Sequence, residues 1–213
     1  MKPDVSSAIP YDLLMSVQKG TMAYSYRGVP MLKNPFDLAL YPLLLAQTKP
    51  RTVLEIGSYK GGSALWFSDI GANLGVRPDI YSIDLQPPQD VKAENIHFIS
   101  GDARALAEAL PDSFMPGLQR PLLVIEDADH HHDTTLAVLR FFDRWLQPGE
   151  YIVIEDGILA DMQVADSYEG GPCSAIDEFL TERGNSYSVD RRFCDFFGRN
   201  VTWNVNGYLR RDK

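Results

Sequence analysis

The stretch from Thr52 to Ser63, TVLEIGSYKGGS, constrains the fold more than any other part of this chain. Its first part, Thr52–Ile56, is short, rich in β-branched residues and apolar except for Glu55, which is typical of a buried strand in a parallel sheet. An apolar segment that predicts a helix begins at Ala64. The turn between them contains three glycines, Gly57, Gly61 and Gly62. Strand, glycine turn and helix form the first half of a nucleotide-binding unit, because glycine lets the backbone approach a ligand and a helix N-terminus offers free N–H groups.

The spacing of these glycines selects among nucleotide ligands. A dinucleotide fingerprint requires G-x-G-x-x-G, but Tyr59 stands where its second glycine would be. A P-loop requires a lysine where Ser63 stands. The remaining pattern, E-x-G-x-x-x-G, carries the carboxylate of Glu55 at the strand end and suits a ligand with positive charge or donor groups. It resembles the first motif of the Rossmann-like S-adenosylmethionine (SAM) methyltransferases, and a strand–turn–helix connection without a ligand is the alternative.

Composition and charge restrict the class of protein. The chain has 213 residues, of which 45% are apolar and 23% charged, as expected for one globular domain. A net charge of −9 without a long Lys/Arg cluster makes nucleic acid and anionic membranes poor partners. The two cysteines, Cys173 and Cys194, have no metal-ligand spacing. No apolar run is long enough for a signal core or a membrane span, so we expect a cytoplasmic protein.

Four further apolar segments predict strands, and an acidic residue follows or ends each one. These segments are Asp79–Leu85, Asn95–Ser100, Pro121–Glu126 and Tyr151–Ile154. Segments with helical character alternate with them, which predicts an open parallel sheet that binds its ligand at the carboxyl ends of the strands. The acids at those ends are Glu55, Asp84, Asp102, Asp127, Glu155 and Asp156. Their coincidence at one edge is stronger evidence for a site than any single acid.

Two of these acids are candidates for binding a nucleoside. Asp84 ends the second predicted strand, where a carboxylate can accept hydrogen bonds from both ribose hydroxyls. Asp102 follows the third, where it can contact an adenine amino group, cap the predicted helix Ala103–Leu110, or do both.

Three other acids predict a metal site. Asp127, Glu155 and Asp156 follow neighbouring strands, and carboxylates that converge repel one another unless a cation holds them. Oxygen ligands favour Mg²⁺ first, with Mn²⁺ and Ca²⁺ as alternatives. Because adjacent strand residues point in opposite directions, Glu155 and Asp156 can share an ion only if the strand has already ended. A set of turn acids without a metal is the alternative.

A histidine near this acidic group is the candidate general base. His130 lies three residues after Asp127, and an imidazole can take a proton from a hydroxyl near neutral pH. The run continues through His131 and His132, which leaves open a transition-metal site or a solvated helix start. Whether Glu126, Asp129, His131 or His132 share in binding a metal or an acceptor stays open.

The flanking segments are expected to enclose the site. Residues 1–34 are predicted to be an N-terminal extension with a short helix, Tyr11–Lys19, and an ordered aromatic loop, Met22–Lys33, that caps a substrate or packs as core. Residues 35–213 are predicted to form one domain that opens with a helix from Asn34-Pro35 to Gln47, with Asn as N-cap and Pro at its first position.

The C-terminal part is predicted to cover the site and complete the sheet. The long loop Ile158–Pro172 is expected to lie over the ligand. A helix, Cys173–Glu182, follows it. Tyr187–Phe193 and Trp203–Leu209 are expected to form an antiparallel strand pair joined by a turn at Gly198.

Taken together, the motifs resemble the cephalosporin hydroxylase-type and rhamnosyl O-methyltransferase group of Mg²⁺-dependent SAM methyltransferases, and they are similar also to macrolide sugar O-methyltransferases. The resemblance spans about Asn34–Arg210 and rests on NPFDLALYPLLLAQTKPRTVLEIGSYKGGSALWFSD, IEDADHHHDTT, YIVIEDG, GPCSAIDEFL and NGYLRR. It implies a Rossmann-like α/β fold: a seven-stranded, mostly parallel sheet with one antiparallel edge strand and helices on both faces. Glu126 departs from the group's pattern, which has an apolar residue there, and is placed to compete for the ion.

The resemblance also implies an enzyme that transfers a methyl group from SAM to a hydroxyl of a small natural product or sugar. Whether the chain forms a homo-oligomer stays open. It implies metal ligation by Asp127, Glu155 and Asp156, with His130 and Asp127 as the catalytic residues. The motifs and the resemblance together indicate these cofactor-binding residues: Glu55, Gly57, Ser58, Gly61, Gly62, Ser63, Asp84, Leu85, Asp102, Ala103 and Asp127. The alternatives are a metal-independent N- or C-methyltransferase and a catalytically silent SAM-fold partner subunit.

Overall fold

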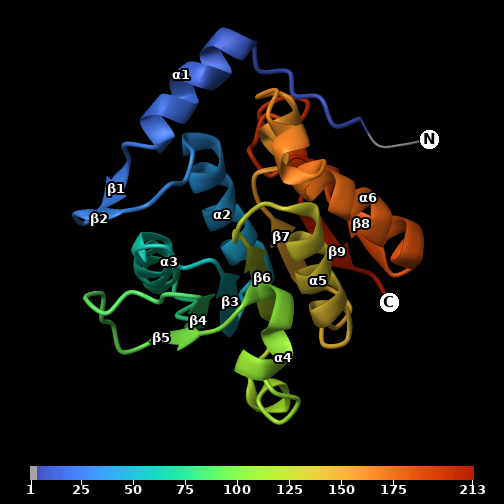
Figure 1. Cartoon of the computed structure of the whole chain (residues 1–213). Coiled ribbons are helices and arrows are strands. Elements are labelled where there is room, and N and C mark those ends of the chain that lie inside the picture. Colours follow the sequence, from blue (N-terminus) through green and yellow to red (C-terminus); the bar gives the residue numbers. More distant parts are fainter. Residues whose placement is uncertain (1–3) are drawn as a thin grey trace.

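A seven-stranded sheet forms the centre of the computed structural model, which describes residues 4–213 (Figure 1). The strand order is β5-β4-β3-β6-β7-β9-β8, and the bounds are Thr52–Ile56 (β3), Asp79–Asp84 (β4), Ile96–Ser100 (β5), Leu122–Glu126 (β6), Tyr151–Ile154 (β7), Tyr187–Val189 (β8) and Tyr208–Arg211 (β9). Strands β3 to β7 pair in parallel, while β9 runs antiparallel to both β7 and β8. The predicted mostly parallel sheet with an antiparallel strand at one edge is confirmed.

The register of the sheet brings the strand ends to one level. Ile56 at the end of β3 pairs with Ile83 of β4 and with Glu126 of β6, and Glu126 pairs with Ile154 of β7. Whatever follows these strands therefore emerges along one edge, as expected for parallel strands.

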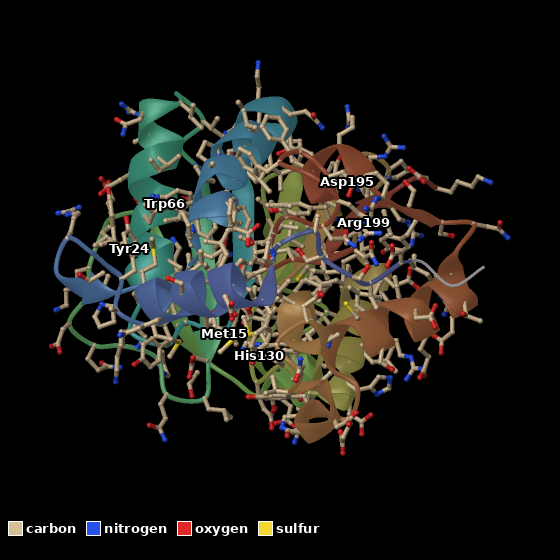
Figure 2. All side chains as sticks on the ribbon, turned by 90° about the horizontal axis from the view of Figure 1, so that it is seen from above. Met15, Tyr24, Trp66, His130, Asp195 and Arg199 are labelled. Atoms are coloured by element: carbon tan, nitrogen blue, oxygen red, sulfur yellow. The ribbon has the colours of Figure 1, made fainter. Side chains whose placement is uncertain are left out.

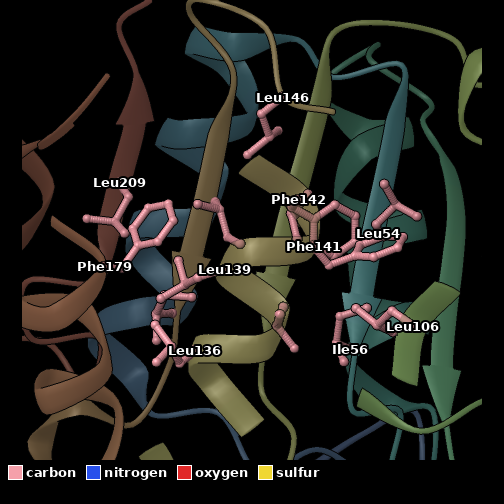
Figure 3. Packing of buried hydrophobic residues seen from close by; sticks show 14 of the residues in the cluster. Leu54, Ile56, Leu106, Leu136, Leu139, Phe141, Phe142, Leu146, Phe179 and Leu209 are labelled. Carbon is pink, nitrogen blue, oxygen red and sulfur yellow. The ribbon is translucent and has the colours of Figure 1, made fainter. Parts of the chain in front are cut away.

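Helices cover both faces of the sheet and bury two apolar cores. On one face pack α4 (Leu106–Ala109), α5 (His132–Asp143) and α6 (Gly171–Arg183), with α5 and α6 side by side (Figure 1). Leu136, Leu139 and Phe142 of α5 lie in the core that includes Leu54 and Ile56 of β3 (Figure 3).

The other core takes the alternate strand residues, such as Val53, as the two-residue period of a strand requires. The helices on this face are α2 (Pro35–Thr48), α3 (Gly62–Asn73) and α7 (Arg191–Cys194). Helix α2 begins as predicted, because the Asn34 side chain accepts hydrogen bonds from the N–H groups of Phe36 and Asp37.

The N-terminal segment, residues 4–33, consists of α1 (Tyr11–Thr21) and a short hairpin of β1 (Ser25–Tyr26) and β2 (Val29–Pro30). The hairpin lies in the stretch expected to be a loop. Helix α1 is anchored by Leu14, which is fully buried in a small third core with Ile158 and Trp203. Seen from above, α1 crosses the molecule near His130, and both contribute to one cavity (Figure 2).

The C-terminal strands are shorter than predicted, and no turn at Gly198 joins them directly. Strand β8 ends at Val189 because Asp190 caps α7, accepting a hydrogen bond from the N–H of Arg192 at 3.1 Å. The chain then returns through an irregular segment before β9. That segment is held by the buried carboxylate of Asp37, which accepts hydrogen bonds from the Trp203 N–H and the Tyr208 hydroxyl, each at 3.0 Å.

Two other predicted segments differ in detail. The helix predicted over Ala103–Leu110 is a 3₁₀ turn, η1 (Ala103–Ala105), followed by α4. The predicted covering loop contains two 3₁₀ turns, η3 (Gly157–Ala160) and η4 (Ala165–Tyr168); another, η2 (Met115–Gly117), precedes β6. Within residues 4–213 there is no helix with the length and apolar character that crossing a bilayer requires.

Candidate active site

A cavity of about 640 Å³ lies at the carboxyl edge of the sheet, a size common for small-ligand sites. Most predicted cofactor-binding residues line it: Gly57, Ser58, Ser63, Asp84, Leu85, Asp102, Ala103 and Asp127. The N-terminal segment contributes Gln18, Thr21, Met22, Met31 and Lys33, and the 157–170 segment contributes Leu159, Met162 and Tyr168. Three parts of the chain that are distant in sequence thus enclose one space.

The glycines of the first turn are required by close chain packing. Gly57 has φ +105°, and a Cβ there would lie 2.0 Å from the carbonyl oxygen of Asp127. At Gly62 a Cβ would lie 2.3 Å from the carbonyl oxygen of Pro30 in the N-terminal segment. Gly61 and Gly62 are buried and do not line the cavity. The glycines therefore let the turn pack closely against both the chain after β6 and the N-terminal segment.

Glu55 lies beneath the cavity and not on its wall. It is fully buried, and the hydroxyl of Ser82 donates a hydrogen bond to its Oε2. The Ser82 Oγ is also 2.7 Å from the Oγ of Ser58, which lines the cavity. Burial raises the pKa of Glu55, while Lys33 lowers it. Glu55 therefore reaches the cavity through a chain of two serines.

The two acids predicted to bind a nucleoside both line the cavity. Asp84 accepts hydrogen bonds from the N–H groups of Tyr59 and Gln86, each at 2.9 Å. Asp102 caps η1 by accepting from the Arg104 N–H at 2.8 Å. Because each carboxylate oxygen has a further lone pair, both acids keep acceptor capacity for a ligand.

Asp127, His130 and Asp156 form a compact cluster on the cavity wall. Each offers one potential ligand atom within 4.8 Å of the others, and the His130 Nε2 lies 3.3 Å from the Asp156 Oδ2. His130 and Asp156 adopt left-handed backbone conformations, with φ of +61° and +55°. Such strain in non-glycine residues concentrates at functional sites. The buried Nδ1 of His130 has no partner among the described residues.

The electrostatics of this cluster fit a bound cation. Burial raises the pKa of Asp156 to about 6, although His130 opposes the shift. Burial lowers the pKa of His130, but the charges of Asp156 and Asp127 outweigh that effect, so the net direction is upward. Burial and the neighbouring charge of Asp127 thus both disfavour an ionised Asp156 carboxyl. A hard divalent cation would favour the ionised form, and carboxylate oxygens are suitable donors for such an ion.

Glu155, predicted as the third metal ligand, lies outside this cluster and is bound by two residues that the sequence reasoning missed. The ammonium of Lys33 is 2.7 Å from the Glu155 Oε2 and also contacts the Asp127 Oδ2. The hydroxyl of Tyr41 donates a hydrogen bond to the Glu155 Oε1. The sequence does contain a hint of the role of Lys33, because it is the only charged residue in the stretch VPMLKNP at the start of α2.

The remaining polar residues of this region have other partners. Glu126 is fully buried and accepts hydrogen bonds from the Ala128 N–H at 3.2 Å and the Thr135 hydroxyl at 3.1 Å. The other three have partners nearby: Asp129 forms an ion pair with Arg104 at 3.0 Å, the His131 Nδ1 lies 3.8 Å from the Glu169 Oε2, and the His132 Nε2 lies 3.2 Å from the Glu178 Oε2. These four residues are not members of the cluster.

Comparison with known proteins gives consistent matches over most of the chain. Residues 18–212 match a family model described as Rhamnosyl O-methyltransferase/CmcI. A rhamnosyl O-methyltransferase of Mycobacterium leprae (strain TN) is 31% identical over 196 residues, which is 88% of this chain and 82% of the relative. One from Mycobacterium tuberculosis (strain ATCC 25618 / H37Rv) is 27% identical over 88% of this chain and 78% of the relative.

Solved structures agree with the fold. A structure described as "cmcI-D160 Mg-SAM" superposes with a TM-score of 0.69 at 27% identity, covering 100% of this chain and 90% of the other. The MycE methyltransferase in complex with Mg, SAH and mycinamycin VI gives a TM-score of 0.60 at 21% identity, covering 100% of this chain and 55% of the other. At that identity MycE supports the fold alone.

Proposed function

The chain belongs to the Rhamnosyl O-methyltransferase/CmcI family of SAM-dependent O-methyltransferases, and from this premise we propose that it is a Mg²⁺-dependent enzyme that methylates a hydroxyl of a small sugar or natural product. One observation carries the proposal. The cluster of Asp127, His130 and Asp156 opens onto the same cavity as the glycine turn at Gly57 and the nucleoside-binding candidate Asp84. Cofactor and proton acceptor therefore face a common space.

The cofactor end of the cavity suits a nucleoside with a charged amino acid tail. Asp84 is proposed to accept hydrogen bonds from the ribose hydroxyls, and Asp102 is proposed to contact the adenine amino group. Gly57 and Ser58 present backbone and hydroxyl groups at the wall, and Glu55 orients Ser58 through Ser82. SAM supplies the methyl group as a sulfonium, and S-adenosylhomocysteine leaves after the transfer.

Asp127 and Asp156 are the residues proposed to hold Mg²⁺, with Glu155 as the predicted third ligand. When bound, the ion would supply positive charge that lowers the pKa of the acceptor hydroxyl. His130 takes the proton that the hydroxyl loses. The Asp156 carboxylate, 3.3 Å from the His130 Nε2, stabilises the imidazolium that results. The hydroxyl oxygen then forms its bond to the methyl carbon as the bond from carbon to sulfur breaks.

The acceptor is proposed to bind between the cluster and the N-terminal segment, so that residues 1–34 act as a cap on the domain of residues 35–213. Met22, Met31 and Met162 line this part of the cavity, and methionine adapts to irregular shapes. Thr21 adds a buried hydroxyl without a partner among the described residues, which is available to a polar group of the acceptor.

A methyl-transfer assay with labelled SAM tests the proposal. The purified chain is offered a panel of glycosides and polyhydroxylated natural products, first with EDTA and then with added Mg²⁺. Turnover that EDTA abolishes and Mg²⁺ restores is the expected result. Turnover that survives EDTA would favour the metal-independent N- or C-methyltransferase, and tight SAM binding without turnover on any acceptor would favour the silent partner subunit.

A further inference from the structure

Lys33 places a positive charge inside the acidic edge of the sheet. Its side chain is only 3% exposed, and its ammonium contacts carboxylates from two strand ends, Asp127 after β6 and Glu155 after β7. A buried ammonium is costly unless it is paired, so these contacts hold the side chain in place. The negative charges of the two carboxylates offset the positive charge of the Lys33 ammonium.

The position of this ammonium conflicts with the predicted ligand set. An ion held by both Asp127 and Glu155 needs the space between their carboxylates, and the Lys33 Nζ lies there. The other oxygen of Glu155 is already engaged by Tyr41. Two cations between the same pair of carboxylates would repel each other strongly in a buried site.

We propose that Lys33 is a resident cation that competes with the divalent cation for Asp127 and Glu155. Lys33 holds the two carboxylates together, and it would withdraw when a divalent cation takes them. The proposal deepens the proposed function and rests on its metal dependence.

Withdrawal of Lys33 should weaken backbone hydrogen bonds in the N-terminal segment. Lys33 lies three residues after Pro30, the last residue of the hairpin. The Lys33 N–H donates to the Met31 carbonyl at 2.9 Å, and the Met31 N–H donates to the Tyr24 carbonyl at 3.1 Å. Pro30 packs against Gly62 at the start of α3. Moving the ammonium away from Glu155 is therefore expected to displace the backbone at Met31 and Lys33 and to weaken these two hydrogen bonds. Cation binding and firm closure of the N-terminal segment oppose each other.

Isothermal titration of the EDTA-treated, dialysed chain with MgCl₂ alone tests the competition. Lys33→Met removes the ammonium but keeps a side chain of similar length. We expect it to bind Mg²⁺ at least about tenfold more tightly than the wild type, because a competing unit charge is gone. Lys92→Met is the matched control, since Lys92 is exposed and does not line the cavity. It makes the same change in net charge and should leave the affinity unchanged.

The outcomes separate this proposal from the proposed function. If the wild type binds Mg²⁺ and Lys33→Met binds it equally or more weakly, Lys33 is no competitor and the inference is wrong while metal dependence stands. If neither protein binds Mg²⁺, both proposals fail together. Lys33→Arg, which keeps the charge, should show no tightening.

A second measurement covers the case in which Lys33→Met is unstable without metal. Thermal melting with and without MgCl₂ should then show a larger stabilisation of Lys33→Met than of the wild type, since ligand binding to the folded state adds stability according to affinity. In the wild type, Mg²⁺ should also speed hydrogen exchange at the Met31 and Lys33 amides. Unchanged exchange at these amides despite Mg²⁺ binding would contradict the withdrawal of Lys33.

Discussion

The carboxyl edge of the sheet and the N-terminal segment line one cavity, but they are built differently. At the edge, Asp127 directly follows β6 and Asp156 lies two residues after the end of β7. The register of both strands is fixed by hydrogen-bonded neighbours on both sides. The N-terminal segment consists of one helix and a small hairpin, and its helix exposes Leu13 and Met15 while burying Leu14. A rigid edge suits groups that must meet within a fraction of an ångström, and a lightly anchored segment suits an acceptor of variable shape.

The largest effect that this contrast predicts comes from the edge. Replacing His130 by Ala should lower kcat by about 10²–10⁴-fold, because the general base is lost. The SAM dissociation constant should change little, since the strand-end residues Gly57 and Asp84 remain. Single-turnover kinetics and a SAM titration measure the two quantities separately. His132→Ala is the matched control, because His132 pairs with Glu178 away from the cluster. An equal loss of SAM affinity in His130→Ala would remove His130 from the role of base.

The backbone of the edge should tolerate change poorly. Gly57→Ala forces a Cβ to 2.0 Å from the Asp127 carbonyl oxygen at a φ of +105°, so we expect a loss of more than about 3 kcal/mol in the free energy of unfolding. Gly20→Ala in α1 is the comparison, since a Cβ there meets nothing within 4 Å. In a helix that change should stabilise by about 0.5–1 kcal/mol. Urea denaturation measures both, and similar values for the two variants would erase the contrast between edge and segment.

The same contrast explains what the sequence predicted well. The strands β3 to β7 are mostly apolar runs with an acid within two residues of their ends. Because parallel strands bring their carboxyl ends together, Asp84, Asp102 and Asp127 could be assigned to one edge without coordinates. Local signals also sufficed for the start of α2, where the side chain of Asn34 caps the helix.

What the sequence could not predict depends on contacts between distant residues. Lys33 and Glu155 are 122 positions apart, and no local pattern pairs an ammonium with a particular carboxylate. The C-terminal strands were predicted too long for a similar reason. Asp190 ends β8 by capping α7, and the buried Asp37 holds the irregular return before β9. Glycine spacing gave the ligand class but not the packing of Gly62 against Pro30.

An intermediate effect is expected where the N-terminal segment is anchored. Leu14→Ala removes a fully buried side chain from the core shared with Ile158 and Trp203, and should cost about 2–4 kcal/mol of unfolding free energy. The neighbouring Leu13→Ala, at an exposed position, should cost no more than about 0.5 kcal/mol. If the segment serves the acceptor, Leu14→Ala should leave the SAM dissociation constant unchanged in a titration. Weakened SAM binding would mean that the segment supports the cofactor end as well.

The smallest effect is expected at the rim of the edge, where Asp129 lies 3.0 Å from Arg104. Both side chains are about half exposed, at 47% and 55%, so water and salt screen the pair. Asp129→Asn should therefore change the SAM dissociation constant by less than about threefold, and the difference should shrink further at high salt. Titrations at low and high NaCl measure this dependence, with Asp133→Asn as a control for removing an exposed acid nearby. A loss of turnover comparable to that of His130→Ala would instead put Asp129 among the residues that touch the metal or the acceptor, and the chemistry would then extend beyond the buried strand ends to the exposed rim.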